Sequence, residues 1–370
     1  HPSTLTSRDD LADAYRDAGR FDEAIILYEQ VFSGRSRVLG PDHRSTLTTC
    51  DDLADTYWEA GRFDEAITLK KQILADAMRI MGPDSSGTSA VRLSLAASYR
   101  DAGRLDEAIT LYQQNLEDRA RILGSDHPHT LTARNQLAGA YRDAGRLDEA
   151  ILLFEQNLTN FTGLAGPDHP HTLSSRGTLA GAYRDAGRLD EAITLYQQNL
   201  DDVARTLGLD HPETLALRHS LAGAYRDAGR LEEAIPLFEQ NLTDFIRILG
   251  PDRPDTFTSR STLAGAYRDA GRLDEAITLF AQTLEDRTRT LGPAHPGTLT
   301  SRNNLAGAYQ AAGRLNEAIT LHRQTLKDCS RTLGPHHPHT LTSRTNLAEA
   351  YRTAGRFEDA EKLFETPSGS

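Results

Sequence analysis

Residue types that mark membrane-spanning and secreted proteins are scarce in this chain of 370 residues. No apolar run approaches the ~20 residues that a membrane-spanning helix needs. There are only two cysteines, Cys50 and Cys329. Because two unpaired thiols suit a reducing compartment, we expect the protein to be cytoplasmic and to make no contact with a membrane.

Positively charged residues are also fewer than negatively charged ones. The 41 lysines and arginines are outnumbered by 53 aspartates and glutamates, which gives a formal net charge of −12. Phosphate backbones are bound by a positive field, so this balance argues against a nucleic-acid partner. The sequence also lacks a glycine-rich phosphate loop and a nucleophile elbow. We therefore predict that the chain is not an enzyme and binds no cofactor and no metal.

What the chain does have is a strict internal repeat. A Gly-Arg pair recurs every 42 residues, at Gly19, Gly61, Gly103, Gly145, Gly187, Gly229, Gly271, Gly313 and Gly355. Repeats aligned on this pair begin at residues 1, 43, 85, 127, 169, 211, 253, 295 and 337. Such a period is typical of stacked architectures, in which each repeat contacts only its neighbours. We predict a single solenoid over residues 1–370, with the last repeat as its C-terminal cap because Glu361 and Lys362 make its outer face polar.

Each repeat shows the signals of two helices and no strand. In the fifth repeat, Pro170 marks a helix start and Gly187 a helix end. Proline is tolerated at the first helical position, and glycine takes the left-handed cap conformation without steric cost. A second helix is predicted from about Leu189 to Gly208, with carboxylates near its amino terminus.

Two residue types recur at fixed places in these helices. Alanine occupies the positions of Ala180, Ala186 and Ala192 in all nine repeats, which predicts close approach of neighbouring helices. Tyrosine occupies the position of Tyr183 in all nine. A ring with a polar tip at such a place is better explained as a packing element than as a binding group.

The spacing Leu-Ala…Tyr…Gly…Ala…Tyr/Phe resembles the tetratricopeptide repeat, here in a 42-residue form. The His-Pro-x-Thr and Leu-Gly-Pro-Asp joints look like those of kinesin-light-chain repeats, and similar arrays occur at the carboxy terminus of bacterial signal-transducing ATPase regulators. The resemblance implies an all-α, right-handed solenoid of nine two-helix repeats, whose first helices line a concave groove that binds proteins or peptides. In one departure, arginine or Cys50 stands where the family has tryptophan early in the first helix.

The concave positions that the resemblance implies carry a row of arginines beside a row of carboxylates. The arginines that we predict as groove residues are Arg100, Arg142, Arg184, Arg226 and Arg268. A second interpretation is that the two rows pair across adjacent repeats and merely solvate the surface. Exposed ion pairs are common and are individually worth only ~0–1 kcal/mol, so both interpretations fit the sequence.

The first two repeats differ from the others at these positions. Their acidic groove residues are Asp9, Asp13, Asp17, Asp51, Asp55 and Glu59, with Trp58 where other repeats carry arginine. We expect a basic segment to dock here, from a partner or from an upstream domain, with Trp58 as an aromatic anchor. The alternative is a solvated acidic edge in which Trp58 packs against a preceding domain.

Two functions follow from this organisation. The leading hypothesis is a protein- or peptide-binding scaffold that serves as the sensor or recruitment arm of a larger regulatory protein. The chain begins inside the repeat pattern rather than at a methionine, which favours a longer protein. The alternative is a self-associating module that mediates oligomerisation, because nearly identical repeats offer many equivalent surfaces.

The joints between repeats carry two further signals. Histidines flank a proline in several joints, as in His127-Pro-His129, but this spacing does not place both rings on one helix face as a metal pair requires. The joint at residues 85–88 has lost the His-Pro pair and gained a glycine, which lowers local stiffness. We expect this joint to be the weakest place in the array.

Overall fold

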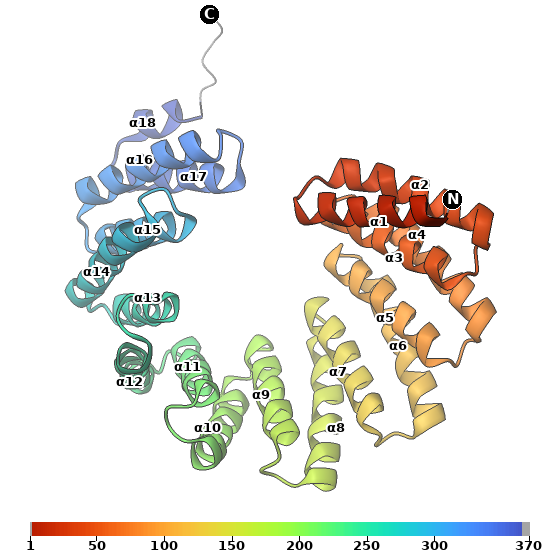
Figure 1. The fold of residues 1–370 in the computed structure, drawn as a ribbon. Helices are drawn as coiled ribbons and strands as arrows, with labels where there is room; N and C mark the ends of the chain where they lie inside the picture. Colours follow the sequence, from red (N-terminus) through yellow and green to blue (C-terminus); the bar gives the residue numbers. More distant parts are fainter. Residues whose placement is uncertain (1, 365–370) are drawn as a thin grey trace, which may run out of the picture. The chain divides into compact units, whose positions relative to one another are not determined.

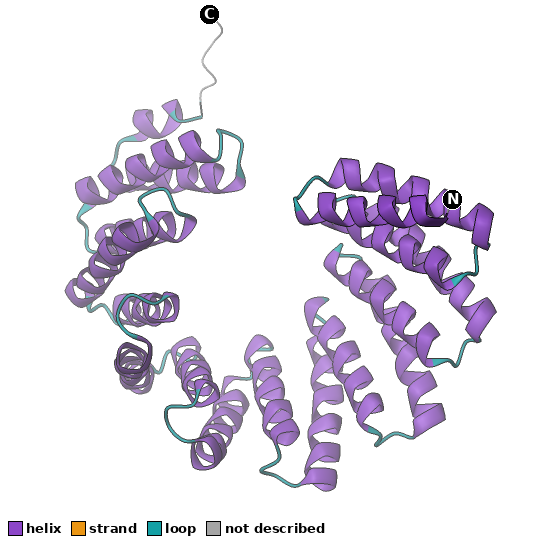
Figure 2. Ribbon diagram, viewed as in Figure 1, coloured by secondary structure: helices purple, strands orange, loops and turns teal. Residues whose placement is uncertain are grey.

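The computed structural model describes residues 2–364, and this range contains eighteen α-helices and no strand (Figures 1 and 2). The prediction of nine two-helix repeats is confirmed. The helices of the first half are α1 (Pro2–Asp17), α2 (Phe21–Leu39), α3 (Arg44–Glu59), α4 (Phe63–Met81), α5 (Ser86–Asp101), α6 (Leu105–Leu123), α7 (Pro128–Asp143), α8 (Leu147–Ala165) and α9 (Pro170–Asp185). Those of the second half are α10 (Leu189–Leu207), α11 (Pro212–Asp227), α12 (Leu231–Leu249), α13 (Pro254–Asp269), α14 (Leu273–Leu291), α15 (Pro296–Ala311), α16 (Leu315–Thr332), α17 (Pro338–Thr353) and α18 (Phe357–Lys362).

The chain divides into two compact units, residues 1–186 and 187–370. Within each unit, every helix packs mainly against the helix before it and the helix after it. In the N-terminal unit, the first helices of the repeats form one layer and the second helices form the other (Figure 1). Each repeat therefore uses its neighbours to cover the apolar sides of its own helices, as a solenoid requires.

Proline and glycine set the helix boundaries as predicted. Pro170 is the first residue of α9, and Gly187, with φ of 71°, follows its C-cap. The histidine that precedes the first helix of most repeats has a role that the sequence did not suggest. In six repeats its Nδ1 accepts a hydrogen bond from the backbone N–H two residues on, so the side chain serves as an N-cap. These histidines are His43, His127, His169, His211, His295 and His337.

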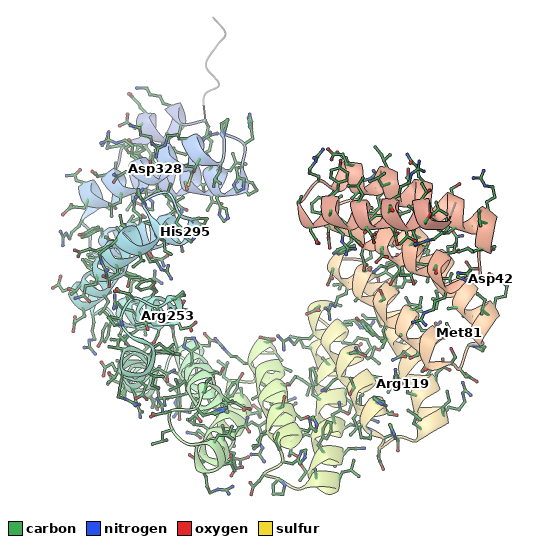
Figure 3. All side chains as sticks on the ribbon, in the orientation of Figure 1. Asp42, Met81, Arg119, Arg253, His295 and Asp328 are labelled. Atoms are coloured by element: carbon green, nitrogen blue, oxygen red, sulfur yellow. The ribbon has the colours of Figure 1, made fainter. Side chains whose placement is uncertain are left out.

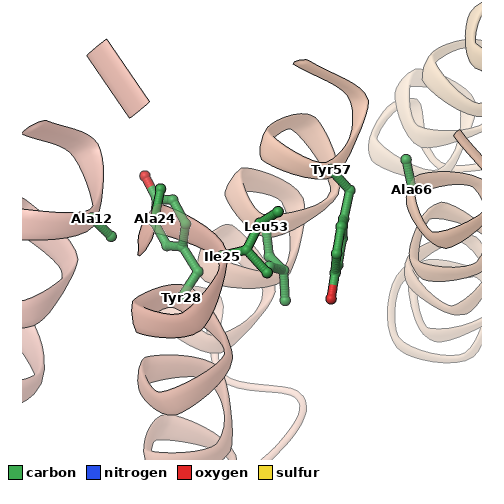
Figure 4. Packing of buried hydrophobic residues seen from close by; sticks show 7 residues of the cluster. All are labelled: Ala12, Ala24, Ile25, Tyr28, Leu53, Tyr57 and Ala66. Carbon is green, nitrogen blue, oxygen red and sulfur yellow. The ribbon is translucent and has the colours of Figure 1, made fainter. Parts of the chain in front are cut away.

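The recurring alanine and tyrosine residues are core residues, except at the third alanine position and at Tyr15 and Tyr309, which are half-buried. Ala12 and Ala24 are fully buried between α1 and α2, and Tyr57 packs into the same cluster (Figure 4). The equivalents of these two alanines are fully buried in every repeat. The third alanine position is different. Ala186 is the C-cap of α9 and is only half-buried, so this alanine ends a helix and does not bring two helices together.

The tyrosine also explains the Gly-Arg pair of the repeat. The hydroxyl of Tyr57 donates a hydrogen bond to Glu29 of the preceding repeat at 2.6 Å. The guanidinium of Arg62, which follows Gly61, lies 4.6 Å from the centre of the Tyr57 ring and donates a hydrogen bond to Glu65 at 2.9 Å. Glycine with a positive φ turns the chain so that this arginine can cover the ring. One tyrosine thus joins two repeats and anchors the turn between helices.

The arginine that replaces the family's tryptophan is buried in five repeats, at Arg92, Arg134, Arg218, Arg260 and Arg302. Arg92, on α5, is 5% exposed and donates a hydrogen bond to Asp118, on α6, at 2.6 Å. The same ion pair joins the two helices of repeats six, seven and eight. A charge in such a position must be paired, because desolvation would otherwise make it costly. In these four repeats a buried ion pair therefore stands where the family has the ring of a tryptophan.

Candidate functional site

The predicted groove positions lie on the exposed side of the first helices, which we call the first-helix face. Its middle part carries the arginine row. Arg142 approaches Asp185 of the next repeat at 3.0 Å, and Arg226 approaches Asp269 at 2.7 Å. Arg100 lies 3.8 Å from Asp143 in the same way.

The two remaining arginines of the row occupy the same positions on their helices. Arg268 lies 3.3 Å from its neighbour Asp269, and Arg184 is half-buried on α9. The pairing of the arginine and aspartate rows between adjacent repeats is therefore realised in this structure. This pairing leaves the middle of the first-helix face with a net charge close to zero.

At the acidic end, three of the predicted carboxylates are held by their own repeat. Asp9 accepts a hydrogen bond from the buried Arg35 at 2.8 Å, and Asp13 accepts one from the hydroxyl of Tyr28. Asp55 forms an ion pair with Lys70 at 2.9 Å.

Lys70 is itself unusual, because it is 7% exposed and stands where most other repeats place a tyrosine or phenylalanine. Its ammonium group also donates to Ser94 of the next repeat, at 3.0 Å. Removing the carboxylate of Asp55 would leave this buried ammonium without its ion pair. Asp55 therefore has a structural role, whatever else it binds.

The other three predicted carboxylates are available to a partner. Asp17, Asp51 and Glu59 are exposed, and none makes a hydrogen bond or an ion pair with the residues that the structure describes. Trp58, the residue before Glu59 on α3, is half-buried, with its ring centre 4.4 Å from that of Phe63. Repeats one and two thus combine exposed negative charge with an aromatic surface.

One further carboxylate of this face was missed in the sequence. Asp52 is half-buried, and its nearest cation is Arg16 at 3.9 Å. Burial raises its pKa to about 6, and although Arg16 opposes this shift, the nearby Asp13 and Asp9 add to it. The signal that could have revealed Asp52 is the Asp51-Asp52 pair, which repeats Asp9-Asp10 of the first repeat.

The comparison with known proteins fits this geometry. The tetratricopeptide repeat profile matches residues 1–78, 87–162, 137–201, 171–243, 213–285, 255–327 and 300–366, and a second tetratricopeptide profile matches residues 52–120. The chain belongs to the tetratricopeptide repeat family. Members of this family are generally protein-interaction scaffolds and are typically not enzymes. No curated protein matches the chain as a relative.

Solved structures show the same type of repeat. A Podosopora anserina structure described as kinesin light chain with nearly identical TPR-like repeats is 35% identical, covering 56% of this chain and 98% of its own, with a TM-score of 0.52. A signal transduction ATPase from Pyrococcus horikoshii with a tetratricopeptide repeat sensor is 13% identical, covering 93% of this chain and 48% of its own, with a TM-score of 0.54. The second likeness shows the tetratricopeptide fold alone.

Within residues 2–364, none of the helices combines the length and the apolar character that crossing a bilayer demands.

Proposed function

We propose that this tetratricopeptide array is a protein- or peptide-binding scaffold whose first-helix face in repeats one and two takes a basic segment. The observation that carries the proposal is the contrast along this face. Arginine and aspartate neutralise each other in the middle repeats, whereas Asp17, Asp51 and Glu59 stay exposed and make no hydrogen bond or ion pair within residues 2–364. Trp58 occupies the arginine position of the second repeat. Unpaired charge attracts a partner of opposite sign, and a partly exposed tryptophan supplies contact area and a surface for a cation.

The wider role that we propose follows from the same features. The array acts as the sensor or recruitment arm of a larger regulatory protein in the cytoplasm, and any catalysis resides outside these repeats. All nine repeats form one solenoid, capped by the last. The likeness to an ATPase with a tetratricopeptide repeat sensor supports this role at the level of the fold.

The single tryptophan makes the proposal directly testable. An oligolysine peptide titrated into the full chain should change the fluorescence of Trp58, with an affinity that falls steeply as salt is added. The triple variant Asp17→Asn, Asp51→Asn, Glu59→Gln should bind the peptide more than tenfold more weakly and with a flatter salt dependence. These three carboxylates are chosen because they support no contact within the fold.

A matched control separates local binding from a general effect of net charge. The variant Asp106→Asn, Glu117→Gln, Asp148→Asn removes the same charge from exposed positions on second helices. It should bind oligolysine as the parent does. Equal loss of affinity in both triple variants, or no loss in the first, would show that the first-helix face of repeats one and two is not the site.

A further inference from the structure

One joint of the array has lost a buried apolar side chain. The fifth position of the repeat is filled by Leu131, Leu215 or Phe257 in other repeats, each 0–2% exposed. In the third repeat this position is Ser89. A cavity of about 130 Å³ lies there, between the start of α5 and the last turns of α6. The side chains that matter for its chemistry are those of Ser85, Ser86, Ser89, Arg92, Asp118 and Arg119.

The carboxylates that line this cavity are already neutralised. Asp118 receives hydrogen bonds from Arg92 at 2.6 Å and from Arg121 at 3.0 Å. Arg121 also pairs with Asp84, the other acidic residue of the lining, at 2.5 Å. Neither carboxylate therefore contributes unbalanced negative charge to the cavity.

Arg119 supplies positive charge that is not balanced in this way. Arg119 lies on α6 (Figure 3). Its Nη2 donates to Ser89 Oγ at 3.0 Å and its Nε to Asn115 Oδ1 at 3.4 Å. Among the described residues it has no carboxylate within ion-pair distance. Its equivalent in the first repeat, Arg35, pairs with Asp9 at 2.8 Å. Arg119 is only half-buried, so the cavity can be reached from solvent.

A buried donor beside the cavity also lacks an acceptor. Asn115 is fully buried and accepts a hydrogen bond from Ser89 Oγ at 2.6 Å, but its Nδ2 has no partner within residues 2–364. In the fourth repeat the equivalent Asn157 donates from Nδ2 to the backbone oxygen of Leu131 at 2.9 Å. A buried polar group without a partner is uncommon, and its position next to Ser89 and Arg119 indicates a missing acceptor.

The start of α5 adds donors to the same wall. Ser85 caps the helix by accepting a hydrogen bond from the N–H of Thr88 at 3.0 Å, and Ser86 begins the helix with no proline at this place. The first backbone N–H groups of a helix lack internal partners and favour negative charge. The hydroxyls of Ser85 and Ser89 already donate to Thr88 Oγ1 and Asn115 Oδ1, so the donors that face this space are the Ser86 hydroxyl, the first backbone N–H groups of α5 and the Arg119 guanidinium.

We infer that this cavity binds a phosphate group through Arg119, the Ser86 hydroxyl and the start of α5. The unbalanced guanidinium provides the charge, and planar guanidinium groups match such oxygens well. The phosphate group can be a free ion or can belong to a phosphorylated residue of a partner. The inference is independent of the basic segment proposed above, because it concerns another surface and the opposite charge.

The experiment is calorimetric titration of the full chain with two probes. Inorganic phosphate tests the free ion, and a phosphoserine peptide beside its unphosphorylated counterpart tests a group carried by a partner. We expect binding of inorganic phosphate or of the phosphopeptide, and no binding of the unphosphorylated peptide. The tighter of the two phosphate probes identifies the source. No binding of either phosphate probe would overturn the inference.

Two variants locate the site. Arg119→Gln removes the charge, and Ser89→Leu restores the leucine of other repeats and fills the cavity. Each should weaken phosphate binding at least tenfold, and the thermal midpoint of Ser89→Leu should not fall, which excludes misfolding as the cause. The matched control is Arg287→Gln, at the same repeat position but where Phe257 fills the space. Full binding by Ser89→Leu, or equal loss in Arg287→Gln, would refute the assignment.

Discussion

The guanidinium of Arg218 donates a hydrogen bond from Nη1 to Oδ2 of Asp244 at 2.7 Å, and joins α11 to α12 inside the sixth repeat. Arg218 is 3% exposed, and the same nitrogen reaches Asn241 Oδ1 at 3.1 Å. Asp244 also accepts from Arg247 at 3.0 Å, and Arg247 pairs with Asp210 at the preceding joint. Burial alone would raise the pKa of Asp244, but the hydrogen bonds from the two arginines hold it below its usual range.

This pair predicts a large effect of a single substitution. Asp244→Leu should leave Arg218 buried without a carboxylate and lower the free energy of unfolding by ~3 kcal/mol, the usual cost of breaking a buried ion pair on one side. Urea denaturation followed by circular dichroism measures the change. Arg247→Gln removes the exposed partner of Asp244 and is the control, for which we expect no measurable loss. Similar midpoints for the two variants would contradict a buried role for the Arg218–Asp244 pair.

The fourth repeat lacks this ion pair and should gain stability when it is restored. Arg134 there donates to Asn157 at 2.9 Å, and burial lowers the pKa of its guanidinium. Asn160 and Gly163 occupy the positions of Asp244 and Arg247. The double variant Asn160→Asp, Gly163→Arg should raise the free energy of unfolding by ~1–3 kcal/mol, as hydrogen bonds to charged groups and removal of a helical glycine each contribute.

Gly163→Ala separates these two contributions to the fourth repeat. A Cβ atom at this position meets no neighbouring atom within 4 Å, so alanine fits without strain. The gain from alanine reports helix propensity alone, which is about 1 kcal/mol. If the thermal midpoint of the double variant does not exceed that of Gly163→Ala, the ion pair adds no stability in this repeat.

His322 makes stability depend on pH. It is 4% exposed, its Nδ1 has no hydrogen-bond partner in the described part of the chain, and burial lowers its pKa. Because the folded pKa lies below the unfolded value of about 6.5, the folded state disfavours the proton, and stability should fall as pH drops through and below about 6.5. His322→Phe, the residue of repeats four, six and seven, should lose less stability between pH 7.5 and pH 5.5 than the parent does.

The control for His322→Phe is the substitution of a histidine on the protein surface. His336 is exposed at the joint before α17 and serves this purpose. His336→Gln should keep the parent's difference in thermal midpoint between the two pH values. An unchanged pH dependence in His322→Phe would mean that the buried ring does not set it.

The joint before α5 should open first when the array fluctuates. It lacks the proline that begins most other first helices, and Ser89 replaces a buried leucine there. Because each repeat is held only by its neighbours, local opening follows local packing. Hydrogen exchange should therefore be faster in α3–α5 than in α11 and α12. Uniform protection along the chain would show that the Ser85–Thr88 joint is no weaker than the rest.

Much of the fold could be predicted because its signals are local. Pro170 and Gly187 mark the ends of a helix through their own backbone preferences, and the tyrosine row shows its packing role by its period alone. The glycine and the tyrosine recur in every repeat, and the proline recurs in all but the second and third. The C-cap position of Ala186 was not predicted, because alanine is compatible with both a helix contact and a C-cap.

The partners of the charged residues depend on contacts between helices. Arg218 meets Asp244, 26 residues later, only after α11 and α12 pack, and Arg226 meets Asp269, 43 residues later, only across a joint between repeats. The amino-acid composition and the 42-residue period would be the same whether these charged side chains form ion pairs or have no partner. The repeat sequence thus specifies the stack of helices through local backbone preferences, whereas packing decides which charges it neutralises and which, as at Asp17, Asp51 and Glu59, it leaves exposed.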